Sequence, residues 1–548
     1  MPRDRFALRY PYPWPMLLLL LVVGAFPSAA QRLTLEHVLP LPDGSEIIAY
    51  DAANHTLLVT GVETIRTYTW DAGPQPPTPA VTIELQDTFA TRDTLRDISS
   101  VAVDPLGRGF GATTLIPSNN GTRRGRVAFF DLATGDRLAT IQAGYHPDSL
   151  VFTPDGRTLV IVNEGEFTSG GDRDAPGSVS LIDITPNPEG PTPRFTYAGD
   201  FPLVWHAMEP SVTLDELRIN DPTTTQPYRH AEPEYAVVIG DPGSYRVVVA
   251  FQENNALGVF NLQRQRWSAL ASLGTWPITL DASDQDGPAI DDHVLALPMP
   301  DTLVAFDHPA VPSQPILATA DEGDFRVDNG DRKRVQNFTN PPPQAEGLAR
   351  LRVSIPDSDP DRDGTLNRHP GAVAPGTRGV SLWAVPTRGN APAHRLGHTG
   401  SLEPYLLQED PQRHNLNSKS APTPGSPDDP PAEATADSRS DDKGPEPEGL
   451  AALPPFDHDD DPGTPPRTYL LVALERQNGL VLLDATDPTQ PTPVAYRNDL
   501  AQLAAPECIL VVPPGDTPDH ATRFVVAYEG NDAGQRIGMG VYRLEPNP

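Results

Sequence analysis

The stretch His146-Pro147-Asp148-Ser149-Leu150 opens an apolar segment, and after a turn at Pro154-Asp155-Gly156 a second apolar segment ends in Val162-Asn163-Glu164-Gly165-Glu166. A Pro-acid pair thus starts one predicted strand, and an acid follows the next. Self-similarity at a spacing of tens of residues is typical of repeat architectures. The same arrangement returns four times: Pro233-Glu234 with Gln252-Glu253, Pro300-Asp301 with Asp321-Glu322, Pro447-Glu448 with Leu474-Glu475, and Pro506-Glu507 with Tyr528-Glu529.

Each unit has the pattern of a β-hairpin, with short apolar strands joined by turns of Pro, Asp or Gly. Two less regular units, at 46–71 and 99–131, precede these five, which gives about seven units of three to four strands. Radial repetition of such units leaves only short, protected sheet edges. The sequence therefore predicts an all-β fold, a seven-bladed β-propeller with long surface insertions. A pair of smaller β domains is the alternative.

The N-terminal segment has the pattern of a secretory signal peptide, because basic residues precede an apolar run and a small-residue cleavage site. The apolar run has too few residues to span a bilayer. We expect a signal peptide over 1–30, a propeller domain over 31–548, and a secreted, extracellular protein with no transmembrane span. The three parts of the pattern are Arg3, Arg5 and Arg9, then Met16–Phe26, then Ser28-Ala29-Ala30.

Residues 402–444 are rich in Pro, Ser, Asp and Glu and contain few large apolar residues. Such a composition buries too little apolar surface to offset the entropy lost on ordering. The sequence therefore predicts a disordered, acidic and proline-rich insertion within the propeller. A second proline-rich stretch, 185–228, is expected on the surface.

The chain carries 73 acidic against 41 basic residues, a net charge of −32. This balance argues against a nucleic-acid partner, which requires a basic surface. It favours cations, a mineral surface or other extracellular proteins as partners, or solubility alone. One cysteine, Cys508, excludes an internal disulfide. Three acceptor sequons predict glycosylation at Asn54, Asn120 and Asn337.

The acids of the repeat are the first candidate site. In an antiparallel hairpin the start of one strand and the end of the next lie at the same edge, so in a propeller these acids would converge at one mouth of the central channel. Clustered carboxylates raise one another's pKa unless a cation compensates, and Ca²⁺ favours oxygen ligands. Alternatively, the acids only bond backbone N–H groups at the turns. The predicted channel-mouth acids are Asp148, Glu164, Glu234, Glu253, Asp301, Glu322, Glu448, Glu475, Glu507 and Glu529.

A second candidate site is the segment 357–364, in which aspartates alternate and a glycine follows. A loop of this kind can wrap Ca²⁺, with the glycine permitting a sharp turn. It is not a complete EF-hand loop, since the twelfth position is Arg368 instead of glutamate. A solvated acidic loop is the alternative. The predicted ligands are Asp357, Asp359, Asp361 and Asp363.

Two bases, Arg439 and Lys443, precede the Pro447-Glu448 phrase and are candidates for binding a phosphate or carboxylate. The alternative role is charge compensation between neighbouring loops. The acid-rich turn Leu280–Gly287 is equally ambiguous. The sequence contains no Gly-x-Ser-x-Gly elbow and no phosphate-cradling glycine loop, so the catalytic residues, if any, stay unknown.

In this order, the phrases resemble the choice-of-anchor I domain family, which includes mesenchyme-specific cell-surface glycoproteins linked to biomineral deposition. The resemblance implies an extracellular β-propeller held at surfaces by varied anchors, without an established reaction, although some relatives carry a phosphatase-like label. The sequence departs from the family at Cys508 and in the insertion 402–438. The resembling phrases are Phe152–Gly156 with Asn163–Glu166, Ala231–Tyr235 with Gln252–Leu257, Leu280–Gly287, Ala320–Arg326 and Ser440–Gly449, and the loop Asp357–Gly364 falls where the family has an aspartate-glycine loop.

These observations lead to one expected function and one alternative. We expect a secreted, Ca²⁺-binding β-propeller glycoprotein with a binding or scaffold role at the cell surface, the matrix or a mineral. The alternative is a metal-dependent, alkaline-phosphatase-like phosphoesterase on the same propeller. There a metal-bound water would attack phosphorus, and Arg439 or Lys443 would hold the phosphate.

Overall fold

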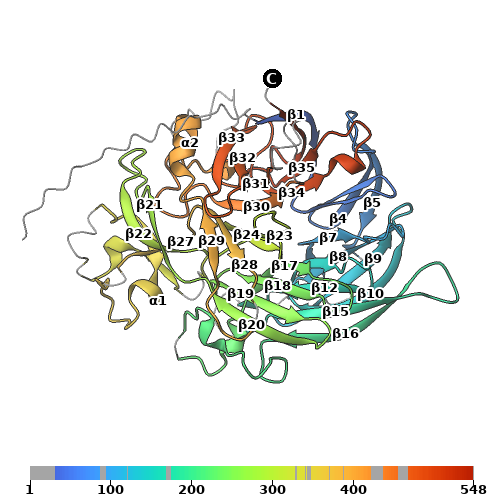
Figure 1. Ribbon diagram of the computed structural model, residues 1–548, viewed down its shortest axis with the longest axis horizontal. Helices are drawn as coiled ribbons and strands as arrows, with labels where there is room; N and C mark the ends of the chain where they lie inside the picture. Colours follow the sequence, from blue (N-terminus) through green and yellow to red (C-terminus); the bar gives the residue numbers. More distant parts are fainter. Residues whose placement is uncertain are drawn as a thin grey trace, which may run out of the picture.

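The computed structural model is all-β, as predicted, and the two α-helices it contains within the described residues are short (Figure 1). These helices are α1, Ile355–Ser358, and α2, Glu403–Glu409. The structure describes residues 31–86, 94–119, 121–167, 174–221, 223–326, 330–339, 341, 347–368, 371–386, 388–420, 436–454 and 467–546. The predicted signal peptide and the sequon residue Asn120 lie outside these ranges.

Seven antiparallel sheets, six of four strands and one of five, form the body of the described part of the chain. In hydrogen-bonded order they begin with β2 (Ile48–Asp51), β3 (Thr56–Thr60), β4 (Thr64–Thr69) and β5 (Thr78–Glu84); then β7 (Val101–Val103), β8 (Phe110–Pro117), β9 (Arg124–Asp131) and β10 (Arg137–Tyr145), with β6 (Leu95–Asp97) also on β8; then β11 (Pro147–Phe152), β12 (Thr158–Asn163), β15 (Ser178–Thr185) and β16 (Arg194–Pro202).

The chain continues in the same way through the remaining sheets. They are β17 (Pro233–Ile239), β18 (Arg246–Phe251), β19 (Ala256–Asn261) and β20 (Arg266–Ser272); β23 (Leu303–Phe306), β24 (Ile316–Asp321), β28 (Gly379–Ala384) and β29 (Arg395–His398); β30 (Pro447–Ala452), β31 (Tyr469–Leu474), β32 (Gly479–Asp484) and β33 (Thr492–Arg497); and β34 (Pro506–Val512), β35 (Arg523–Tyr528), β36 (Gly538–Pro546) and β1 (Gln31–Pro40).

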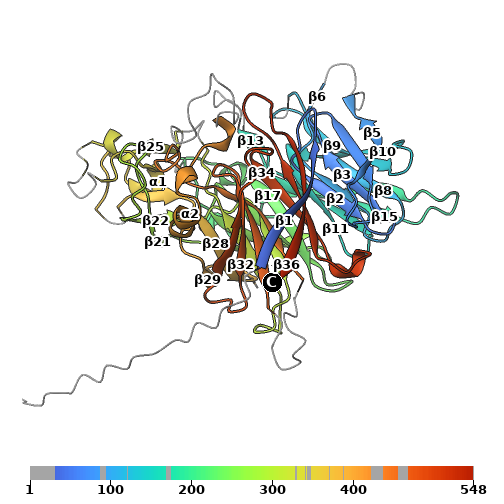
Figure 2. The same ribbon diagram turned by 90° about the horizontal axis from the view of Figure 1, so that it is seen from above.

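The first strands of the seven sheets contact one another in chain order: β2 meets β7, then β11, β17, β23, β30 and β34, and β34 returns to β2. The two ends of the described chain share the last sheet, because β1 pairs antiparallel with β36. Figures 1 and 2 show the sheets arranged around a common centre, with β1 beside the C-terminal strand. No helix in the described ranges is both long and apolar enough to cross a membrane.

Apolar side chains between neighbouring sheets form the core. One cluster joins β12 and β15 to β18 and β19 through Val160, Leu181, Val249 and Phe260, and the buried ring of Trp267 packs against it. Clusters of the same kind follow at the next sheet interfaces. Because each sheet is covered by two neighbours, strands such as β31 are buried along their whole length. This explains the continuous apolar runs in the sequence.

Four of the five Pro-acid phrases share a backbone feature. The residue before the proline has a positive φ, as at His146 (44°), Met299 (45°), Glu446 (55°) and Ala505 (55°). In three of these units its carbonyl accepts the N–H of the acid that follows the next strand, at 2.8 Å from Glu164 and 2.9 Å from both Glu475 and Glu529. In the same three units the register shifts just after the proline, which places a β-bulge at the start of the first strand. This shared geometry brings the two acids of a unit to one edge.

A lateral unit lies to one side of the ring of sheets (Figure 1). It contains α1 and a mixed sheet in which β22 pairs parallel with β27. Its strands are β21 (Trp276–Leu280), β22 (Asp292–Leu297) and β27 (Val373–Pro375), with β25 (Arg332–Arg334) and β26 (Arg352–Ser354) beside them. The described chain also has β13 (Glu166–Phe167), β14 (Asp174–Ala175) and the 3₁₀ turns η2 (Leu214–Glu216), η3 (Pro227–Arg229), η5 (Val335–Asn337), η7 (Pro411–Arg413), η8 (Ser418–Ser420) and η10 (Pro514–Asp516).

The prediction that 402–444 is a disordered insertion is wrong for its two flanks, 402–420 and 436–444, which have defined structure. Helix α2 lies in the first flank, and a buried turn over 437–444 forms the second. Arg378, which is fully buried, joins them: its guanidinium donates to Glu403 at 2.5 Å and to the carbonyl of Ser440 at 2.8 Å. Buried hydrogen bonds from this arginine hold the two flanks, which have few large apolar side chains to bury. Residues 421–435 lie outside the described ranges.

Candidate functional site

A pocket of about 330 Å³ lies where the first strands begin and gathers many of the predicted acids. Lys419, Glu46 and the apolar residue Ile47 also line it. The acids come from different sheets, since each unit delivers its own pair to this edge. Six of the ten predicted channel-mouth acids line the pocket: Asp148, Asp301, Glu448, Glu475, Glu507 and Glu529.

The other four predicted acids lie beside the pocket and have close partners. Glu164 lies 2.9 Å from Nδ1 of His146. Glu234 and Glu253 share a hydrogen bond between their two carboxyl groups. Glu322 accepts a hydrogen bond from Gln252 at 2.8 Å and pairs with a lysine described below. These four acids therefore extend the acidic region but do not line the same pocket.

Lys419 is the base of the pocket, and sequence reasoning missed it. Its Nζ lies 2.6 Å from Glu475 and 4.0 Å from Glu507, and it also pairs with Glu529. These acids raise the pKa of Lys419 above its usual range, in spite of burial, which lowers it. The lysine comes from η8, in the insertion, more than fifty residues from its nearest partner in sequence. No local pattern indicates that contact.

The predicted anion-binding bases, Arg439 and Lys443, are both held by carboxylates. Nε of Arg439 donates to Glu446 at 2.7 Å, and the same guanidinium lies 3.2 Å from Asp442. Lys443 pairs with Glu322 and lies 3.1 Å from Glu446. This is the charge compensation between neighbouring loops that the sequence offered as the alternative role.

Burial raises the pKa of several pocket carboxyls. It raises the pKa of Asp301 to about 6 and, together with Asp97, that of Glu46 to about 8. Burial, then the neighbouring acids, raise the pKa values of Glu448 and Glu507 well above the usual range. By contrast, burial alone would raise the pKa of Glu529, but Lys419 lowers it. Lys419 and Arg476, whose Nη1 lies 3.2 Å from Glu475, therefore compensate Glu448 and Glu507 only in part.

Three of these acids have ligand spacing for a cation. One carboxylate oxygen each of Glu448, Glu475 and Glu507 lies within 4.8 Å of the other two. Oε2 of Glu448 and Oε1 of Glu507 are buried without a hydrogen-bond partner among the described residues, although the two carboxyl groups also share a hydrogen bond with each other. A hard cation such as Ca²⁺ takes carboxylate oxygens as ligands. The residues present therefore fit a calcium ion, and Lys419 competes for two of the three carboxylates.

The predicted calcium loop brings together three of its four aspartates. Asp359, Asp361 and Asp363 each place a carboxylate oxygen within 4.8 Å of the other two. Asp359 also accepts the backbone N–H groups of Asp363 at 3.1 Å and Gly364 at 2.9 Å, which shapes the loop. Asp357 does not join them, because it pairs with Arg218 at 2.6 Å.

Two of the three sequons lie in the described residues. Asn54 is exposed, and its Nδ2 donates to Asp51 at 2.7 Å. Asn337 is exposed at the end of η5. Cys508 lines the acidic pocket from β34, and burial raises the pKa of its thiol to about 11. A protonated thiol is a weak nucleophile, so Cys508 is unsuited to covalent catalysis.

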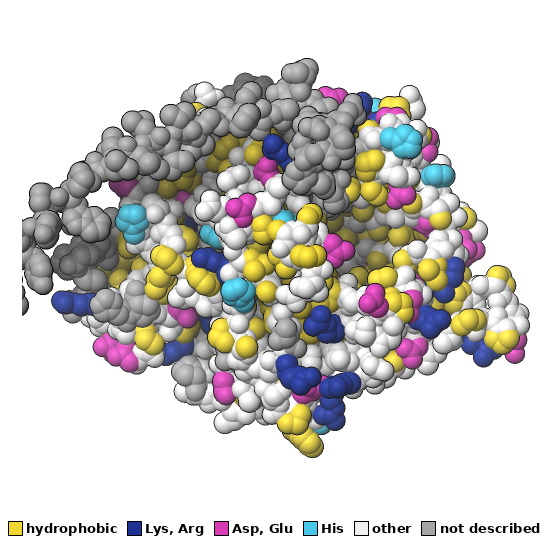
Figure 3. Space-filling view, in the orientation of Figure 1, with side chains coloured by type: hydrophobic (Ala, Val, Ile, Leu, Met, Phe, Trp, Pro, Cys, Tyr) yellow, Lys and Arg dark blue, Asp and Glu magenta, His cyan; other side chains and the backbone are white. Residues whose placement is uncertain are grey.

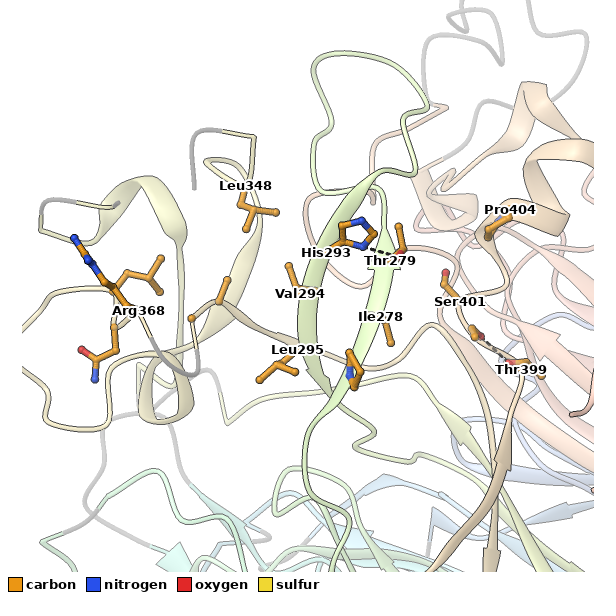
Figure 4. Close-up of a pocket in the computed structure, with 16 residues that line it drawn as sticks. Ile278, Thr279, His293, Val294, Leu295, Leu348, Arg368, Thr399, Ser401 and Pro404 are labelled. Atoms are coloured by element: carbon orange, nitrogen blue, oxygen red, sulfur yellow. Dashed lines mark hydrogen bonds between the residues drawn. The ribbon is translucent and has the colours of Figure 1, made fainter. Parts of the chain in front are cut away.

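A wider pocket of about 1060 Å³ lies on the lateral unit, away from the acids (Figure 4). Ile278 of β21 and Val294 and Leu295 of β22 line it, and Nδ1 of His293 lies 2.9 Å from Oγ1 of Thr279. None of the predicted site residues lines this pocket. On the face in Figure 3, acidic side chains are scattered over the surface.

Comparisons with known proteins give a family and distant structural similarities. A model of the choice-of-anchor I domain matches residues 46–488. No curated protein matches the chain. Three solved structures are similar at low identity: hydrazine synthase from Kuenenia stuttgartiensis (TM-score 0.41, 10% identity, 92% of this chain and 97% of that one), a protein from Lactobacillus plantarum (0.41, 11%, 94% and 99%), and a functionally unknown protein from Desulfotomaculum acetoxidans (0.39, 10%, 84% and 86%). At these TM-scores the similarities carry no argument about function.

Proposed function

The chain belongs to the choice-of-anchor I domain family, and from this premise we propose that it is a secreted, Ca²⁺-binding, seven-bladed β-propeller glycoprotein with a binding or scaffold role. The seven sheets are its blades, and the cycle of contacts among their first strands surrounds its axis. Pairing of β1 with β36 closes the ring. The acidic pocket is then the mouth of the axial channel.

The observation that carries the calcium proposal is the group Glu448, Glu475 and Glu507. Their oxygens are close enough to share one ion, and two buried oxygens accept no hydrogen bond within the described ranges. Leaving buried carboxylates uncompensated is costly, so a cation here offsets both desolvation and mutual repulsion. The loop acids Asp361 and Asp363 are exposed and support a second, weaker site with Asp359.

The scaffold role follows from what the pocket contains. It holds carboxylates and a lysine that is already paired, which suits a cation shared with a partner or a mineral surface. The sequons at Asn54 and Asn337 are exposed, as glycosylation in a secreted protein requires.

The phosphoesterase alternative gains less support. It needs a base that is available to a phosphate, whereas Arg439 and Lys443 are held by Glu446 and Glu322. Neither base lines the pocket of Glu448 and its neighbours.

Calcium titration by calorimetry, with phosphomonoester hydrolysis measured on the same sample, tests the proposal. We expect saturable binding at two sites without metal-dependent turnover. Turnover that requires the metal would favour the phosphoesterase, and the absence of calcium binding would reject the calcium proposal. The matched variants are Glu448→Gln in the pocket and Glu209→Gln, whose carboxylate pairs with Arg264 near the surface.

A further inference from the structure

A buried group of three side chains, separate from the acidic pocket, has the composition of a transition-metal site. Nε2 of His414 lies 3.0 Å from Oδ2 of Asp281, and an oxygen of Asp437 lies within 4.8 Å of both ligand atoms. His414 is fully buried, and Asp281 and Asp437 are 1% and 6% exposed. These residues come from three places: the end of β21, the residue after η7, and the far flank of the insertion.

We propose that Asp281, His414 and Asp437 bind a divalent transition metal such as Zn²⁺, which joins both flanks of the insertion to the lateral unit. The proposal does not depend on calcium binding in the acidic pocket. An imidazole with two carboxylates is a mixed nitrogen and oxygen donor set, which suits zinc or a similar ion. Calcium prefers a shell of oxygens alone.

Charge supports this proposal. Arg378, a buried cation beside the group, pairs with Glu403 at 2.5 Å and donates from its two Nη atoms to carbonyls, including that of Asp281 at 2.8 Å. Its charge is therefore offset by Glu403. When both aspartates are ionised they share only one imidazole, so even a protonated His414 leaves them one positive charge short. A divalent ion supplies this charge, whereas an uncompensated buried carboxylate is costly.

Hydrogen bonds hold both carboxylates of the group. Asp281 accepts the backbone N–H of Ala289 at 3.1 Å, and Asp437 accepts the hydroxyl of Ser440 at 2.6 Å. Hydrogen bonds of this kind fix the orientation of ligating carboxylates. A neutral imidazole bound to a metal through Nε2 keeps its proton on Nδ1.

A further polar group next to the site lacks a partner. Asn415 is fully buried, and its Nδ2 lies 3.2 Å from Nε2 of His414. Oδ1 of Asn415 and Nδ1 of His414 have no hydrogen-bond partner among the described residues. Unsatisfied buried polar atoms are rare in native structures and often mark a missing ion or water. The unsatisfied Oδ1 of Asn415 favours a ligand at this group, whereas Nδ1 of His414 points away from the ligand position at Nε2.

The test uses the full chain, freed of metal by dialysis against EDTA and then titrated with Zn²⁺ in the presence of saturating Ca²⁺. We expect one zinc site, and we expect Asp437→Asn and His414→Gln each to weaken zinc affinity by at least about 100-fold. The matched control is His398→Gln: His398 faces the buried Asp321 at 3.8 Å but belongs to none of the candidate metal groups of the described chain. It should bind zinc as the unchanged chain does.

Absence of zinc binding to the unchanged chain, or unaltered affinity in both ligand variants, would overturn the proposal. If the variants do not fold, hydrogen exchange on the unchanged chain decides. Zinc should slow exchange in 411–420, 436–444 and 280–289 and leave 357–364 unaffected. Slowing confined to other segments would likewise reject the site.

Discussion

Nζ of Lys419 lies 2.6 Å from Oε1 of Glu475, so a lysine from the insertion reaches a carboxylate that the repeat supplies. The same ammonium pairs with Glu529 and lies 4.0 Å from Glu507. The acidic pocket is therefore built from two sources. The repeated units bring the acids, and the insertion between two of them brings the partial countercharge.

Replacing Lys419 with methionine should destabilise the calcium-free chain and strengthen calcium binding. Breaking a buried ion pair costs about 3–5 kcal/mol, and we expect the lower end of that range because Lys419 is 19% exposed. The vacated carboxylates should bind Ca²⁺ more tightly, by about tenfold. Scanning calorimetry without calcium measures the loss of stability, and calcium titration measures the gain in affinity. Lys333→Met, on the lateral unit, is the control and should leave calcium affinity unchanged. Weaker calcium binding in Lys419→Met would show that the lysine does not compete with the ion.

The variant Glu448→Gln should separate binding from folding. The pKa of Glu448 is raised by burial and then by the charges of Glu475 and Glu507, so its ionised form destabilises the folded state. An amide needs neither a buried charge nor the uptake of a proton on folding, so the melting temperature without calcium should rise by about 2 °C or more. Calcium affinity should fall by at least about tenfold. A variant that melts earlier and binds calcium normally would make Glu448 a structural residue only.

Stability without calcium should fall as the pH rises from about 4.5 to 8. Burial raises the pKa of Glu253 to about 7 and that of Asp301 to about 6. In this window the folded chain holds protons that the unfolded chain has released, so the free energy of unfolding decreases with pH. Melting curves in EDTA should show a smaller decrease for Glu253→Gln than for the unchanged chain. Equal slopes would contradict the raised pKa, and calcium should restore stability at pH 8.

The double variant Asp361→Asn, Asp363→Asn should remove one calcium ion without unfolding the chain, since both side chains are exposed. Asp359 is left intact because it shapes the loop through two backbone N–H groups. The control, Asp357→Asn, should lower stability through loss of the Arg218 pair and keep the calcium stoichiometry. Unchanged stoichiometry in the double variant would reject this loop as a calcium site.

Much of the fold could be predicted from the sequence because the repeat is local. The Pro-acid phrase and the acid after the next strand are joined by one hairpin, as Glu164 N–H to the His146 carbonyl at 2.8 Å illustrates. The order of the two apolar segments and the acids that flank them was therefore enough to place Asp148 near Glu164. The family could also be recognised from the sequence, because its characteristic segments occur in the expected order along the chain.

The partners of these acids could not be predicted in the same way. Lys419 and Lys443 lie in a proline-rich, acidic stretch whose composition is typical of disorder. The turn that contains Lys443 is bound by the distant Arg378, through the carbonyls of Ser440 and Asp442. Glu46 also lines the acidic pocket, but Ser45 and not proline precedes it, so the repeat pattern did not identify it. His414 reaches Asp281 across more than 130 residues without any metal-ligand spacing in the sequence. Contacts of this kind depend on how the insertion packs against the sheets.

Anomalous diffraction from crystals grown with Ca²⁺ or its analogue Tb³⁺ tests the central claim most directly. Our account predicts a peak about 2.3–2.6 Å from carboxylate oxygens of Glu448 and Glu507, with Lys419 displaced from at least one of its acids. Peaks confined to the loop of Asp361, with Lys419 still bound to Glu475, would contradict it.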